Sequence, residues 1–104
     1  MFLLNAFSLN MLELFPAIAT LTELTLGEVK SLLASSEWSS GVGHADTAAV
    51  FADALGTDVP CARVTVTLKK GDVAIVGQYR GPRLPEGAHK LPEGATIQWV
   101  KVEM

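Results

Sequence analysis

Cysteine, basic residues and long apolar runs are all scarce in this chain of 104 residues. Cys61 is the single cysteine, so no internal disulfide can form and a reducing compartment, the cytoplasm, is the expected location. Every apolar run is too short to cross a membrane, and no basic segment precedes the apolar N-terminus, so we expect neither a membrane span nor a signal peptide. Apolar residues make up 49% of the chain, which excludes disorder and predicts one folded domain over residues 1–104.

The net charge of −3 is low for a protein that binds long DNA or RNA through its phosphate backbone. The charges are unevenly distributed, however. Residues 1–58 carry seven acids and one base, whereas residues 59–104 carry four acids and seven bases. An anionic ligand is therefore expected against surfaces built from the second half of the chain.

Hydrophobic periodicity and turn residues predict an α/β (α+β) domain with a mixed sheet of about five strands and two or three covering helices. The expected strands are Met1–Leu4, Ala17–Leu24, Arg63–Leu68, Val73–Tyr79 and Thr96–Glu103. Arg63–Leu68 alternates strictly, and we expect it to form a hairpin with Val73–Tyr79 through the turn at Lys69–Asp72. The expected helices are Leu26–Ser35, with a Thr25/Glu28 capping box, and His44–Leu55, with Gly56 as its C-terminal cap.

Asn5, Ser8 and Asn10 follow the first strand directly. Ligands of α/β sheets collect at strand ends, so these side chains are candidate ligand contacts. Alternatively, Asn and Ser satisfy the backbone of the turn itself, and spacing alone favours that interpretation.

His44 follows Gly41-Val42-Gly43 at the start of the second predicted helix. The free N–H groups of a helix N-terminus suit a phosphate oxygen, and a histidine there can protonate a leaving group beside a bound phosphate. A capping or surface histidine is the alternative. His44, His89 and Cys61 lack the spacing of metal ligands, so no metal site is expected.

Basic residues gather around the predicted hairpin. Arg63 would open one strand, and Gln78 and Arg80 would close its partner, so cross-strand pairing should bring them together, with Arg83 nearby. Guanidinium groups bind phosphate oxygens in a forked geometry. A solvated basic edge that blocks strand pairing explains the pattern equally well.

Glu86 lies three residues after Arg83 in a loop rich in proline and glycine. A carboxylate there could orient a nucleophile, act as a base, or pair with the arginines. The segment Leu84–Ala88 (LPEGA) recurs as Leu91–Ala95, so spacing alone does not separate Glu86 from Glu93, and His89 lies between the two copies.

Together these segments resemble the viral anti-CRISPR ring nucleases, a family of small viral and bacterial proteins that counteract type III CRISPR signalling by degrading cyclic tetra-adenylate. The resemblance covers nearly the whole chain. Its pieces, in the family's order, are Leu4–Leu12, Gly43–Thr47, Arg63-Val64 and Arg83–Gly87.

The resemblance implies a two-fold homodimer that holds one cyclic tetranucleotide at its interface and cleaves it without a metal or other cofactor. A ribose 2′-hydroxyl would attack the adjacent phosphate and leave linear products with 2′,3′-cyclic phosphate ends. His44 matches the family's general acid. Glu86 matches its catalytic glutamate rather than Glu93, because Arg83 fills the motif's arginine where the second copy has Lys90.

The resemblance also implies the residues that would bind substrate. Arg63 and Arg83 match phosphate-binding arginines. Pocket-lining polar residues match Asn5, Ser8, Asn10, Thr47 and Gln78.

Two other functions remain open at the level of sequence. The chain could sequester cyclic oligoadenylate without cutting it, or it could be a viral DNA-binding dimer, which its acidic charge disfavours. A viral origin would place it in the host cytoplasm.

Overall fold

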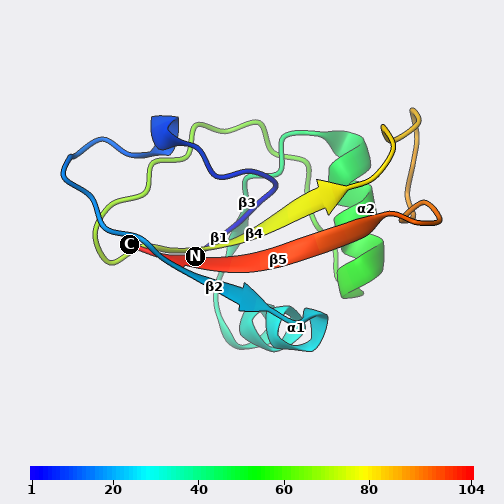
Figure 1. Cartoon of the computed structure of the whole chain (residues 1–104). Coiled ribbons are helices and arrows are strands. Elements are labelled where there is room, and N and C mark those ends of the chain that lie inside the picture. Colours follow the sequence, from blue (N-terminus) through cyan, green and yellow to red (C-terminus); the bar gives the residue numbers. More distant parts are fainter.

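A five-stranded mixed sheet forms the centre of the computed structural model, which describes residues 1–104 (Figure 1). The strand order is β2-β5-β4-β1-β3. The strands are β1 (Phe2–Leu4), β2 (Thr20–Leu24), β3 (Ser39–Ser40), β4 (Val73–Arg80) and β5 (Thr96–Glu103). β1 runs parallel to β3 and β4, whereas β5 runs antiparallel to β4 and β2. The predicted mixed sheet and fold class are confirmed.

Two α-helices, α1 (Leu26–Ser35) and α2 (Ala45–Leu55), and one short 3-10 helix, η1 (Leu9–Met11), complete the fold. The predicted capping box starts α1. The Thr25 N–H donates to the Glu28 carboxylate at 2.8 Å, and the Glu28 N–H donates to the Thr25 hydroxyl at 3.2 Å. Both helices therefore lie where the sequence places them, and His44 is the N-cap of α2.

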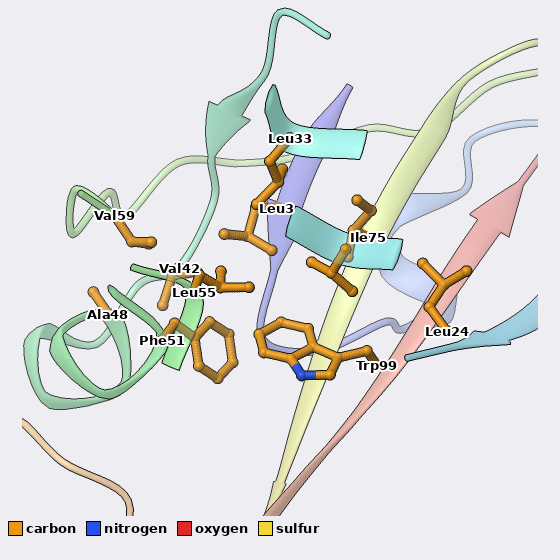
Figure 2. Packing of buried hydrophobic residues seen from close by; sticks show 11 residues of the cluster. Leu3, Leu24, Leu33, Val42, Ala48, Phe51, Leu55, Val59, Ile75 and Trp99 are labelled. Carbon is orange, nitrogen blue, oxygen red and sulfur yellow. The ribbon is translucent and has the colours of Figure 1, made fainter. Parts of the chain in front are cut away.

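The main core lies between the sheet and the two helices (Figure 2). Phe51 of α2 packs against Trp99 of β5 with ring centroids 5.0 Å apart. A Cβ on Gly77 would lie 2.5 Å from Trp99 and 2.7 Å from Phe51, so glycine is what allows this ring pair to sit on β4. The opposite face of the sheet carries a second, smaller cluster. It is built from loop residues and from strand residues that alternate with those of the main core.

The predicted hairpin between Arg63–Leu68 and Val73–Tyr79 is wrong. Both edges of β4 are already paired, one with β5 and the other with β1, so no edge is left for residues 63–68. That segment instead runs extended over the face opposite the helices, where Val66 and Leu68 are buried in the smaller cluster. Its alternation reflects this half-burial, but the only β pairing is an isolated bridge from Leu68 to Leu12.

The remaining differences are at element boundaries. The strand predicted over Ala17–Leu24 begins at Thr20, and the two-residue strand β3 forms where the sequence predicts no strand. β5 has its predicted bounds, and β4 extends one residue further, to Arg80. No helix is long and apolar enough to span a membrane.

The parallel strands determine where a site can form. β1, β3 and β4 all point the same way, so their carboxyl ends lie along one side of the sheet. The chain leaves these ends at Asn5, at Gly41 and at Gly81. Open α/β sheets bind ligands beyond such strand ends.

Candidate functional site

His44 lies at the N-terminus of α2, four residues after β3 ends. Its backbone is extended, with φ −122° and ψ 127°, and its side chain makes no capping hydrogen bond. The imidazole is exposed and makes no hydrogen bond within the chain. The imidazole therefore does not cap the helix, while its exposure agrees with the surface-histidine alternative and leaves it free beside the open N–H groups of the first turn, which also contains Thr47.

Arg63 lies beside His44. Its Nε donates to the carbonyl oxygen of Gly43 at 2.9 Å, and the neighbouring Ala62 N–H donates to the Val42 oxygen at 2.8 Å. These two bonds fasten residues 62 and 63 to the strand-to-helix connection. The terminal nitrogens of Arg63 form no hydrogen bond or ion pair within the chain, so they can bind an anion near His44.

Glu86 and Arg83 lie on the loop between β4 and β5, which Figure 1 shows extending beyond the sheet near α2. The Ala88 N–H donates to the Pro85 oxygen at 3.0 Å, which closes a turn around Glu86. The Gly87 N–H donates to Oδ1 of Asp46, in the first turn of α2, at 3.1 Å. The loop turn that carries Glu86 is thus joined to the helix turn that follows His44.

Arg80, which the sequence places in the basic cluster, has other partners. Its Nη2 donates to Gln98 at 2.6 Å, and Gln98 in turn donates to Glu23 at 2.7 Å. Because residues 63–68 do not pair with β4, the predicted cross-strand grouping of Arg63 with Gln78 and Arg80 is wrong. Gln78 is exposed on β4, and its amide donates to the Tyr79 oxygen at 3.3 Å.

The polar segment after β1 is attached more loosely. The Ser8 hydroxyl accepts the Asn10 N–H at 3.3 Å as the N-cap of η1, so Ser8 does satisfy its own turn. The side chains of Asn5 and Asn10 make no hydrogen bond within the chain. No hydrogen bond joins this segment to His44, Arg63 or Arg83. Within one chain, hydrogen bonds therefore attach Arg63 and the turn that carries Glu86 to Gly43 and Asp46, which flank His44, but attach the asparagines to neither.

The side chains of His44, Arg63, Arg83 and Glu86 are all exposed. A groove of about 690 Å³ and a second cavity of about 600 Å³ are lined by other residues. The groove lies between the loop after η1 and the turn at Lys69-Lys70. No cluster of three His, Cys, Asp or Glu side chains is placed to hold a metal ion.

Asp46 is the residue that reasoning from the sequence missed. It stands inside the segment Gly43–Thr47 that carries the family resemblance, yet spacing assigns it no role. Its partner, Gly87, is 41 residues away along the chain. Only the fold brings the two together.

Known proteins match this chain over nearly its whole length. A family model described as STIV B116-like matches residues 1–98. A solved structure, B116 of Sulfolobus turreted icosahedral virus, is similar with a TM-score of 0.81 and 28% identity, over 99% of this chain and 97% of that one. No curated protein shows significant sequence similarity. All the candidate residues lie within the matched region.

Proposed function

This chain belongs to the STIV B116-like family, and from that premise and the residues around His44 we propose that it is a ring nuclease. Its substrate is cyclic tetra-adenylate, its products are short linear oligonucleotides with 2′,3′-cyclic phosphate ends, and its effect is to switch off type III CRISPR signalling. The sequence resemblance to ring nucleases and the similarity to a protein of a virus both support this proposal.

One observation carries the proposal: a free, exposed histidine at the N-terminus of α2, next to the residue that binds the Arg63 guanidinium and two residues before the one that binds the turn carrying Glu86. The bond from Arg63 to Gly43 and the bond from Gly87 to Asp46 both end within two residues of His44. A phosphate bound at the open helix N-terminus would therefore have an acid and a cation beside it, and a carboxylate on the neighbouring turn.

The proposed reaction is internal transesterification. The ribose 2′-oxygen attacks the adjacent phosphorus in line with the departing 5′-oxygen; the P–O2′ bond forms and the P–O5′ bond breaks. Glu86 accepts the proton of the 2′-hydroxyl, and His44 donates a proton to the 5′-oxygen. Arg63 and Arg83 neutralise charge on the non-bridging oxygens. Placement, proton transfer and charge neutralisation are sufficient for this reaction, and no metal is required.

The active form in this proposal is a two-fold homodimer. A cyclic tetranucleotide carries four phosphates, and each chain contributes two phosphate-binding arginines, Arg63 and Arg83. The asparagines after β1, which do not contact His44 within one chain, would complete the pocket at the dimer interface. The backbone of residues 63–67 supports this arrangement, because none of its N–H or C=O groups is hydrogen-bonded within the chain and Val64 is 56% exposed.

Incubation of the purified chain with labelled cyclic tetra-adenylate in EDTA tests the proposal. We expect linear products with cyclic phosphate ends, separable from the ring by chromatography. Ring that stays intact for hours while binding tightly would instead identify a sequestering protein. If the chain neither bound nor cleaved the ring, both functions would be rejected. A gel shift of duplex DNA at physiological salt would then favour DNA binding.

A further inference from the structure

The two LPEGA copies have the same local conformation. In the first, the Ala88 N–H donates to the Pro85 oxygen at 3.0 Å, and in the second the Ala95 N–H donates to the Pro92 oxygen at 3.0 Å. Gly87 and Gly94 share a φ of +79°, which a side chain would strain. Local geometry therefore gives Glu86 and Glu93 equivalent turns and does not distinguish them.

The surroundings of the two turns differ. Ala95, at the end of the second copy, is buried against Gly81 at the root of the loop, where a Cβ on Gly81 would lie 2.6 Å from the Ala95 methyl. The first copy is separated from β4 by three residues, whereas the second leads directly into β5. Its bond from Gly87 to Asp46 is the single hydrogen bond between residues 83–95 and the rest of the chain.

We propose that Asp46 is a positioning residue, which fixes the first LPEGA turn beside His44 and so makes Glu86, not Glu93, the working glutamate. The inference deepens the proposed function and rests on it for the role of Glu86. The Gly87 N–H belongs to the peptide that links Glu86 to Gly87, so its bond to Asp46 fixes the backbone immediately after the Glu86 Cα. Asp46 itself is held by the first turn of α2.

Asp46 has a second possible role, which the test must separate from the first. A carboxylate in the first turn of a helix interacts favourably with the helix dipole. That effect depends on the negative charge. The proposed positioning depends on an oxygen that accepts a hydrogen bond. Asp46→Asn removes the charge and keeps an acceptor oxygen, whereas Asp46→Ala removes both.

Amide hydrogen exchange of the full-length, isotope-labelled chain measures the bond directly. We expect the Gly87 amide to be protected relative to Gly94 in the wild type and in Asp46→Asn. In Asp46→Ala it should exchange about tenfold faster or more, the scale of one hydrogen bond to a charged acceptor. Gly94 is the internal control and should not change. A Gly87 amide that exchanges as fast as Gly94 in the wild type, or equally slowly in Asp46→Ala, would overturn the inference.

Ring cleavage gives the second measurement. Asp46→Ala should lower kcat while leaving the Kd for cyclic tetra-adenylate within about threefold, since the phosphate contacts remain, and Asp46→Asn should restore most of the rate. Glu86→Gln should abolish most turnover and Glu93→Gln should not. Equal losses in both Asp46 variants would assign the effect to the helix charge and reject positioning. Failure of the wild type to cleave would reject the proposed function alone, because the exchange experiment still decides whether Asp46 holds the turn.

Discussion

His44 and His89 are both exposed, but they differ in what surrounds them. His44 stands at the open end of α2, whereas Nδ1 of His89 faces the Gly87 oxygen at 3.5 Å within the loop. We predict that His44→Ala lowers the turnover of cyclic tetra-adenylate by about 10²–10⁴-fold, the usual contribution of a general acid, with little change in ligand affinity. Single-turnover kinetics and equilibrium binding measure the two effects. His89→Ala is the matched control. Near-normal turnover by His44→Ala would show that His44 takes no part in the mechanism.

The arginines of the β4–β5 region differ in the same way. The guanidinium of Arg80 is bonded to Gln98, whereas that of Arg83 has no partner within the chain. We predict that Arg83→Ala weakens ligand binding about 10–100-fold, as expected for loss of a charge-assisted phosphate contact, and that Arg80→Ala leaves binding unchanged. Calorimetric titration of cyclic tetra-adenylate into an inactive His44→Ala background makes the comparison. Equal effects of the two substitutions would mean that general positive charge, not Arg83, binds the ring.

Two glycines give opposite predictions for stability. A methyl group on Gly77 would collide with the Phe51–Trp99 pair, whereas a methyl group on Gly27 in α1 would meet nothing closer than the Thr25 hydroxyl at 4.0 Å. Gly77→Ala should therefore lower the free energy of unfolding by about 1–3 kcal/mol through overpacking. Gly27→Ala should raise it by up to about 1 kcal/mol through helix propensity. Urea denaturation measures both, and a neutral Gly77→Ala would show that the ring pair can shift.

At the scale of elements, the capping box of α1 makes stability depend on pH. The hydrogen bond from the Thr25 backbone N–H, followed by that with the Thr25 side chain, lowers the pKa of the Glu28 carboxyl below its ordinary value of 4.5. Since folding favours the ionised form, this contribution is complete above pH 4.5 and is lost as the pH falls through the lowered value.

Glu28→Gln isolates this effect, because glutamine keeps a capping oxygen without the charge. We predict that the wild type is more stable than Glu28→Gln at neutral pH and that the difference disappears in acid. Denaturation at a series of pH values measures it. A difference that is independent of pH would mean that the charge of Glu28 plays no part in capping.

Elements fixed by local signals could be predicted, and those fixed by distant pairing could not. Thr25 and Glu28 specify the start of α1, and the alternation of Thr96–Glu103 specifies β5. Polar and apolar residues alternate just as well over residues 63–68. Whether such a segment joins a sheet, however, depends on which strands of the sheet have an unpaired edge. β1, far away in the sequence, occupies the edge of β4 that a hairpin would need.

The candidate site follows the same rule. The position of His44 could be predicted from its own neighbours, because helix starts are local. The contact of Arg63 with Gly43 spans 20 residues, and that of Gly87 with Asp46 spans 41, so neither leaves a mark in local spacing. The erroneous grouping of Arg63 with Arg80 follows from the predicted hairpin, which fails because β1, distant in the sequence, pairs with β4.

At the scale of the whole molecule, the chain has two candidate surfaces for a second copy. One is the open backbone of residues 63–67, with exposed Val64 beside Arg63. The other is the edge strand β2 with the apolar loop before it, where Ile18 is 84% exposed. Only the first is continuous with the candidate site. We therefore expect the proposed dimer, which would enclose a ring between two copies of His44, to use the surface around Val64.

The matched substitutions Val64→Lys and Ile18→Lys test this choice. A two-fold interface uses the same patch of both chains, so Val64→Lys places two lysines in it and should convert a dimer into a monomer through charge repulsion and loss of apolar contact. Both side chains are exposed in the single chain, so neither variant should change monomer folding by more than a surface substitution does, about 0.5 kcal/mol. Sedimentation equilibrium measures the association. If Ile18→Lys dissociates the dimer and Val64→Lys does not, the second copy pairs through the β2 edge. Each His44 would then lie on an open surface, and the two copies of His44 could not enclose one ring between them.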